Sequence, residues 1–419
     1  MKMNLPRAAQ YAMRALTNAG HQAYIVGGSV RDVLLGKQPD DYDITTSALP
    51  DEVIELFRRD KLVLNGLKHG TVRLIKYAMP IEITTFCLGG GYEDDDADDV
   101  LFTGSLYQDV QRRDITINAL CWSEQAGLID YVGGQEDLEN HLIRCVGEPN
   151  ASFQEDPLRI LRALRFSAVL DFDIDPPTAR GIHDNAALLS ELPGERVLME
   201  LKKLLCGPRA EAVLVEYRDA FEAMMPELAS LTADEYLLAG RRVSLIAPAP
   251  ELRLAALLVG LSREAAEACA ARVKVSKLTR KFLEGVFEHA REPLPVDRVG
   301  MRHAMNEYGD ELLAGLVELR AANLKALTHM IIQQNDCVSL KQLALTAEDV
   351  FELGVTRRGT PACLHALLER VMNGELSNTR EALSAAVREE VAAKNAMKTA
   401  TTPKKRHRPR KGAQDAPEA

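Results

Sequence analysis

Residues 23–46 read AYIVGGSVRDVLLGKQPDDYDITT. Aromatic and β-branched residues at 23–26 and 42–45 predict two short strands, and the SVRDVLLG between them predicts a helix that its glycine closes. The chain thus passes from a strand through two glycines into a helix, and soon afterwards into a second strand. This stretch predicts a mixed α/β domain with a small sheet.

Polar residues at the two ends of this stretch form a candidate site. Gly28 lies where the first strand meets the helix, so backbone N–H groups can approach an anion there, and Arg31 can hold a phosphate. Asp41 and Asp43 stand at i and i+2, positions that point to the same side of a strand. Two adjacent carboxylates repel unless a cation lies between them, and Mg²⁺ prefers carboxylates together with substrate phosphates. Glu82, on a later predicted strand, is placed to add a third carboxylate, although a glutamate on an edge strand facing water fits equally well.

Outward from this stretch the sequence contains two kinds of structure. Runs at 62–64, 71–75 and 81–86 predict further strands, separated by Gly, Asp and Pro clusters. From about residue 152 onward, apolar residues recur at helical spacing and strand signals almost vanish. We therefore predict an α+β fold in which a small mixed sheet is followed by a long all-α remainder.

Composition and charge exclude several classes of protein. The 419 residues are 46% hydrophobic and 27% charged, as in soluble globular proteins, and no apolar run approaches the roughly 20 residues that a membrane span needs. The seven cysteines are scattered without a C-x-x-C pair, which excludes a disulfide framework or a cysteine zinc site and indicates a cytoplasmic protein. The net charge of −10 conceals a basic end, because residues 394–411 hold eight Lys or Arg and no acid. Such an end suits contact with a polyanion, and a solvated tail explains it equally well.

Many short motifs in a fixed order carry a family resemblance. They read YIVGGSVRDVLLGKQPDDYDITTSALPDEV, KHGTV, IEITTF, QRRDITINAL, DYVGGQEDL, IRCVGEP and EDPLRILRALRFSAVL. These motifs resemble those of the bacterial class II CCA-adding enzymes, which are tRNA nucleotidyltransferases of the family that also contains bacterial poly(A) polymerases. The resemblance implies template-independent addition of C, C and A to the 3′ end of tRNA from CTP and ATP, with Mg²⁺ and release of pyrophosphate.

The resemblance also implies a domain order and a set of site residues. The expected segments are a catalytic head at 1–147, a helical neck at 148–207, a helical body at 208–340, a tRNA-binding tail at 341–395 and a basic disordered extension at 396–419. Asp41 and Asp43 match the catalytic, metal-binding pair. The positions that match nucleotide contacts are Gly28, Arg31, Arg113, Asp156, Arg159, Arg162 and Arg165, with Asp114 and Asn118 in support.

The spacing on the neck helix suits recognition of a base. Arg159, Arg162 and Arg165 recur every three residues, so they form a slowly turning row along the helix. Cytosine and adenine each present an amine donor beside an unprotonated ring nitrogen. A carboxylate such as Asp156, which only accepts, and a guanidinium, which only donates, complement that pattern. Guanine and uracil present the reverse pattern. The competing interpretation is structural, because Asp-Pro commonly opens a helix.

Three alternative functions remain open from the sequence. Six acids between residues 93 and 99 stand where relatives usually have basic residues, which leaves the final A step open and allows a CC-only adding enzyme. The basic end favours a poly(A) polymerase, whereas LKHGTVRLI favours a CCA-adding enzyme. A non-catalytic RNA-binding protein is the third alternative. LRLAALLVGL stands where many relatives carry a His-Asp pair, so we expect no phosphohydrolase activity.

The expected macromolecular partner is tRNA, gripped at the acceptor–TΨC arm by the helical C-terminal half. An enzyme that accepts every tRNA must recognise shape and backbone rather than base sequence. Phosphate contacts should therefore make affinity fall with salt. The sequence leaves open the oligomeric state and the side chains that contact tRNA.

Overall fold

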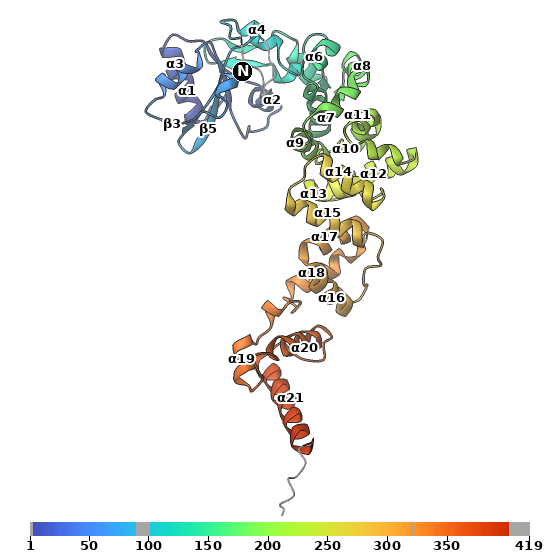
Figure 1. Ribbon diagram of the computed structural model, residues 1–419. Helices are drawn as coiled ribbons and strands as arrows, with labels where there is room; N and C mark the ends of the chain where they lie inside the picture. Colours follow the sequence, from blue (N-terminus) through green and yellow to red (C-terminus); the bar gives the residue numbers. More distant parts are fainter. Residues whose placement is uncertain (1–2, 89–100, 321, 402–419) are drawn as a thin grey trace, which may run out of the picture. The chain divides into compact units, whose positions relative to one another are not determined.

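The computed structural model describes residues 3–88, 101–320 and 322–401 (Figure 1). Two compact units divide the chain, Met1–Ala290 and Arg291–Ala419. The first unit contains a mixed sheet followed by helices, and the described part of the second is helical. This confirms the predicted α+β class. The finer boundaries predicted after residues 147, 207, 340 and 395 lie within these units and stay predictions.

A seven-stranded sheet forms the centre of the head. Its strands, in spatial order, are β3 (Lys61–Val63), β4 (Thr71–Lys76), β5 (Met79–Thr85), β2 (Asp43–Thr46), β1 (Ala23–Val26), β6 (Cys121–Ser123) and β7 (Gly127–Ile129). β2 and β5 are parallel, and every other neighbouring pair is antiparallel. Ile25, Ile44 and Ile83 are fully buried on the central strands, which explains why these short runs form the core of the sheet.

Short helices complete the head: α1 (Arg7–Asn18), α2 (Gly28–Leu34), α3 (Pro50–Leu56), α4 (Leu106–Gln111) and α5 (Gly134–Glu139). Gly27 has a φ of 76°, a conformation that favours glycine, and it lets β1 turn directly into α2. The predicted strand–glycine–helix arrangement at the start of the head is therefore confirmed. The second strand begins at Asp43, one residue later than expected, so Asp41 lies just before the strand.

The helices that follow in the first unit are α6 (Pro149–Glu155), α7 (Leu158–Leu170), α8 (Pro176–Asn185), α9 (Gly194–Leu205), α10 (Ala210–Glu216), α11 (Arg218–Met224), α12 (Ala233–Leu245), α13 (Pro250–Leu258), α14 (Arg263–Arg272) and α15 (Lys277–His289). A small parallel pair, β8 (Leu142–Ile143) and β9 (Asp173–Ile174), links the end of the head to the chain after α7. α7 packs against α9, whose buried Val197, Leu201 and Leu204 recur at helical spacing.

The second unit contains α16 (Arg298–Tyr308), α17 (Asp310–Arg320), α18 (Lys325–Gln333), α19 (Ala347–Glu352), α20 (Thr360–Met372) and α21 (Arg380–Thr401). Its apolar residues form two clusters, one around Met301, Leu313 and Ile331 and the other around Val350 and Leu383. Within the described ranges, no helix is both long and apolar enough to cross a membrane.

Candidate active site

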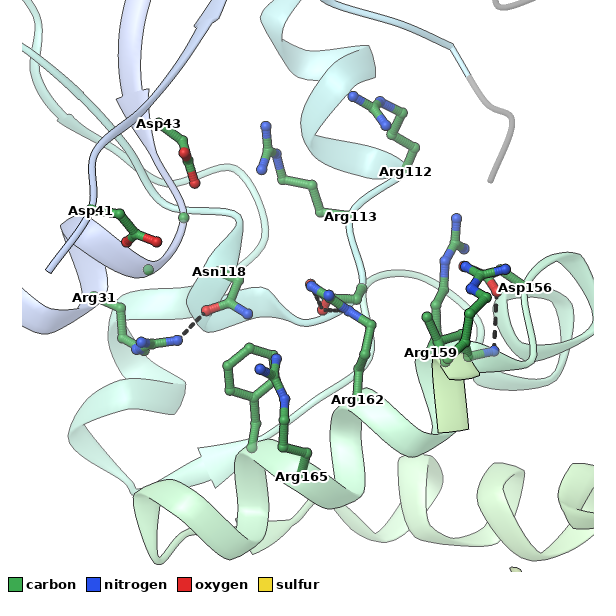
Figure 2. A pocket seen from close by; sticks show the side chains of 16 residues that line it. Arg31, Asp41, Asp43, Arg112, Arg113, Asn118, Asp156, Arg159, Arg162 and Arg165 are labelled. Carbon is green, nitrogen blue, oxygen red and sulfur yellow. Dashed lines mark hydrogen bonds and ion pairs between the residues drawn. The ribbon is translucent and has the colours of Figure 1, made fainter. Parts of the chain in front are cut away.

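A pocket of about 400 Å³ lies between the head and helix α7 (Figure 2). Every residue to which the family resemblance gives a catalytic or nucleotide-binding position lines it: Gly28, Arg31, Asp41, Asp43, Arg113, Asp156, Arg159, Arg162 and Arg165. In Figure 2 the aspartate pair and the Asp156–Arg159 couple lie on opposite sides, with Arg162 and Arg165 between them. The fold thus joins residues from four separate stretches of chain around one cavity.

The turn from β1 into α2 supplies one wall of this pocket. Arg31 is buried, and its guanidinium donates to Asn118 Oδ1 at 2.7 Å and to Asp32 Oδ1 at 2.8 and 2.9 Å. These contacts fix the guanidinium at the pocket, where it can meet an anion. Asn118 thus contacts Arg31 directly, and its supporting role in nucleotide binding stays a prediction.

Asp41 and Asp43 lie close enough for their charges to interact. Burial, followed by the charges of Asp41 and Glu82, raises the pKa of Asp43 to about 7, against the opposing effect of Arg113. Such repulsion is relieved when a cation binds, because a positive ion favours both charged carboxylates. The pair therefore fits a hard divalent cation by the chemistry of its oxygen donors.

Glu82 is the direct neighbour of Asp43 across β2 and β5 but does not line the pocket. Its carboxylate instead accepts from Arg73 at 2.5 and 3.1 Å. Among the described residues, no group of three or more His, Cys, Asp or Glu is placed to hold a metal ion. The structure therefore assigns Glu82 a cross-strand ion pair and leaves two carboxylates at the candidate metal site.

The arginines of α7 form the opposite wall, and each is paired with a carboxylate. The ion pairs are Arg159–Glu155 at 2.8 Å, Arg162–Asp114 at 2.7 Å and Arg165–Glu200 at 2.8 Å. The sequence predicts the row of arginines but not these partners. These carboxylates hold the guanidiniums in position, and all three arginines still line the pocket.

Asp156 and Arg159 both line the pocket, and the backbone N–H of Arg159 donates to the backbone carbonyl of Asp156 at 3.0 Å. Asp156 Oδ1 accepts from the backbone N–H of Leu158 at 3.0 Å, so it also caps α7 as the structural interpretation predicts. The Arg159 guanidinium donates to Ser152 Oγ and to Glu155, each at 2.8 Å. Asp156 keeps further acceptor capacity, and Arg159 keeps further N–H groups, with which each could bind a ligand in the pocket.

Sequence reasoning assigned no place in the pocket to four residues that line it, Arg112, Leu158, Phe166 and Arg196. The motif QRRD contains both Arg112 and Arg113, but the resemblance assigns a nucleotide contact only to Arg113. The centroid of the Phe166 ring lies 3.8 Å from the Arg165 guanidinium carbon and 5.3 Å from that of Arg31. Nothing in the local pattern distinguishes Arg196, which comes from α9. Altogether seven arginines and four aspartates line the pocket, a positive excess that suits a triphosphate.

Comparison with known proteins agrees with this geometry. Residues 23–144 match the poly A polymerase head domain, and residues 171–231 match the "Probable RNA and SrmB- binding site of polymerase A". Fold and site together define a polymerase-type nucleotidyltransferase head joined to an RNA-binding region. At the level of whole chains, a CCA-adding enzyme of Geobacillus stearothermophilus is 34% identical over 390 residues, which cover 89% of this chain and 94% of the relative. The chain belongs to the CCA-adding enzyme family.

Two further relatives extend this comparison. A CCA-adding enzyme of Limosilactobacillus reuteri is 45% identical over 210 residues, so the match spans only about half of that relative's length, 52%. The crystal structure of the Bacillus stearothermophilus CCA-adding enzyme in complex with CTP superposes with a TM-score of 0.74 at 29% identity. That match covers 93% of this chain and 98% of the solved one. Members of this nucleotidyltransferase family generally use a divalent metal.

Proposed function

We propose that this chain adds C, C and A to the 3′ end of tRNA, using CTP and ATP and releasing pyrophosphate. The observation that carries the proposal is the single pocket that joins the Asp41–Asp43 pair to the Asp156–Arg159 couple. The first pair can promote transfer of a nucleotide, and the second can select the base. A site with only one of these pairs would not combine the two tasks.

The residues of the pocket divide the work of the reaction. Asp41 and Asp43 would hold Mg²⁺, which when bound promotes attack by the terminal ribose hydroxyl and stabilises the leaving pyrophosphate. Arg31 and Arg113 face the pocket from the head and would bind the triphosphate. Arg162 and Arg165 line the same pocket from α7, and the stacked Phe166 helps to hold Arg165 in place.

Base selection follows from the chemistry of the couple. Asp156 accepts from the exocyclic amine of C or A, and Arg159 donates to the adjacent ring nitrogen. Guanine and uracil would place a carbonyl against the carboxylate and an N–H against the guanidinium. The ion pair with Glu155 stabilises the position of the Arg159 guanidinium and so favours one orientation of the bound base. Discrimination between C and A requires pocket size and the RNA end as further determinants.

Two features bear on the alternative products. The acidic segment at 93–99, which leaves room for a CC-only product, lies outside the described residues, and so does most of the basic end. The poly(A) polymerase alternative rests on that basic end and on the match to the poly A polymerase head domain. That match does not separate the two enzymes, because they belong to the same family. The whole-chain match to a CCA-adding enzyme favours the complete CCA product.

A single assay separates these products. A tRNA that ends at its discriminator base is incubated with all four NTPs and Mg²⁺, and the 3′ ends are sequenced. Addition of CCA supports the proposal. Addition of CC alone or of a long A tract selects one of the other enzymes, and an unchanged end selects the non-catalytic RNA-binding protein.

We also propose that tRNA is the partner and that the helical half of the chain binds it. A second proposal is that the protein is located in the cytoplasm. The matched RNA-binding region at 171–231 supports the first proposal. All seven cysteines are free thiols, and six of them are buried, which supports a reducing compartment. Binding of tRNA should weaken steeply as salt rises, because phosphate contacts dominate such affinity.

A further inference from the structure

Asp109 is a fully buried carboxylate on α4 that does not itself line the pocket. Its Oδ1 accepts from Arg112 Nε at 3.0 Å and Nη2 at 2.8 Å, and its Oδ2 accepts from Arg113 Nη2 at 3.0 Å. Both arginines do line the pocket (Figure 2). One hidden carboxylate therefore contacts two of the cations that face the nucleotide site.

The charge balance of this group has a direct consequence. One negative charge is shared by two guanidiniums, so the cluster keeps a net positive charge that faces the pocket. Burial alone would raise the pKa of Asp109, but the charges of Arg113 and Arg112 outweigh it and hold the pKa below its usual range. The carboxylate is therefore ionised at neutral pH and can orient both side chains.

Two further contacts connect Asp109 to the central sheet. The hydroxyl of Thr45 donates to Oδ2 at 3.1 Å, and the backbone N–H of Cys87 donates to Oδ1 at 3.3 Å. Thr45 is fully buried on β2, two residues after Asp43. The same carboxylate thus contacts the strand that begins at the metal-binding aspartate and the arginines that face the triphosphate.

We propose that Asp109 is a positioning residue that fixes Arg113, which would bind the triphosphate, and its pocket-lining neighbour Arg112 relative to the strand that begins at Asp43. This inference rests on the proposed function and adds to it a residue outside the pocket. Because the triphosphate is common to CTP and ATP, Asp109 should affect both nucleotides alike. Because Asp156 and Arg159 read the base separately, Asp109 should not change base choice.

The test compares two variants of this group with two matched controls in the full-length chain. Asp109→Asn removes the charge, and Thr45→Val removes only the hydroxyl. Asp137 offers a matched control, because it is a buried head carboxylate that pairs with Arg144 and accepts from Thr116 at 2.6 Å, outside the pocket. Asp137→Asn and Thr116→Val therefore repeat the same two changes away from the arginines.

Steady-state kinetics with CTP and with ATP provide the readout. Asp109→Asn removes the charge that holds both arginines, which predicts a rise in the KM for both nucleotides of about tenfold or more. Thr45→Val removes one hydrogen bond to the carboxylate and leaves both ion pairs in place, which predicts a smaller rise of about fivefold. Thr45→Ser should restore the parent KM, because it keeps the hydroxyl. The ratio of C and A to U and G incorporation should not change, and the controls should keep the parent KM.

Parent KM values in both Asp109→Asn and Thr45→Val would overturn the inference, as would an equal KM rise in the Asp137 controls. If Asp109→Asn does not fold, Thr45→Val and Thr45→Ser still decide the matter. A parent enzyme that adds no nucleotide contradicts the proposed function instead. In that case, equilibrium dialysis of CTP with the same variants measures the effect of Asp109 on binding.

Discussion

Asp43 shows how the surroundings of one residue define a site. Its burial and the neighbouring charges of Asp41 and Glu82 make its ionised form costly, and they raise its pKa to about 7. A protein that only needed a stable strand would gain by a neutral residue there. A buried carboxylate at this place fits the proposed cation-binding role, since the charges of Arg113 and Arg73 do not offset the cost of its ionisation.

Asp41→Asn and Asp43→Asn should each reduce addition of both C and A by about 10³-fold or more, because the metal contributes several kcal/mol to every transfer step. Single-turnover assays with CTP and then ATP measure this loss. Glu82→Gln is the matched control, since Glu82 adjoins Asp43 but bonds to Arg73. An equal loss in Glu82→Gln would show that sheet structure, and not metal binding, is being measured.

Arg159→Ala should relax base choice more than it weakens binding of the triphosphate. We expect misincorporation of U or G to rise about tenfold relative to C, because one directional donor is lost. Arg113→Ala should instead raise the KM for all nucleotides and leave the base ratio unchanged. Sequencing of products made with mixed NTPs checks both outcomes, and identical product profiles in Arg159→Ala and the parent would contradict the base-selection role.

At the scale of elements, ion pairs between helices and loops place the functional side chains. Arg162 on α7 reaches Asp114 in the head, and Arg165 reaches Glu200 on α9. In the second unit, Asp336 joins α16 to the chain after α18, accepting from Arg298 at 2.5 Å and from Arg302 at 2.7 Å. These buried or half-buried pairs act over short distances and depend on both partners.

Asp336 predicts a pH dependence for the second unit. Its hydrogen bond from Arg298, together with those from Arg302, lowers its pKa. A depressed pKa stabilises the fold above the unfolded value of about 3.9, and this contribution is lost as pH falls through the folded value. Asp336→Asn should therefore destabilise α16 by about 2 kcal/mol at pH 7, with a smaller difference from the parent in acid.

Hydrogen exchange of α16 peptides in the full-length chain, at neutral pH and in acid, measures this difference. Glu311→Gln, which removes an exposed carboxylate on the neighbouring α17, is the control and should have little effect. A difference between Asp336→Asn and the parent that stays constant into acid would contradict the ion-pair explanation.

On the scale of the whole molecule, charge is distributed unevenly. The chain carries a net charge of −10, although residues 394–411 contain eight basic side chains and no acid. Only a local positive surface can therefore attract RNA without repulsion from the acidic remainder. The pocket, with its excess of arginines over aspartates, is one such local positive surface.

Removal of residues 396–419, the basic extension, should weaken tRNA binding mainly at low salt, because the extension adds sequence-independent attraction to phosphates. Titrations at low and high salt measure this change. A full-length variant with glutamine in place of the basic residues of the extension separates charge from length and should bind like the truncated chain. An unchanged Kd at low salt would assign the extension no role in tRNA binding.

The sequence by itself determined the local elements and the identity of the site. The run at 23–26 forms β1, Gly27 forms the turn, and the motifs from Asp41 to Arg165 supply every predicted pocket residue. These predictions succeed because strand and helix propensity, glycine turns and short motifs act between neighbours in the chain. Apolar residues at helical spacing from about residue 152 onward also predicted the helical remainder.

Only the tertiary structure decided which side chains meet. Glu82 faces Asp43 because β2 and β5 pair in parallel, yet Arg73 from the next strand bonds to its carboxylate. Arg196 enters the pocket through the packing of α9 on α7, and Asp109 contacts Thr45 across 64 positions. Ion pairs and burial depend on distances in space, which no local pattern records, so these partners could not be read from the sequence.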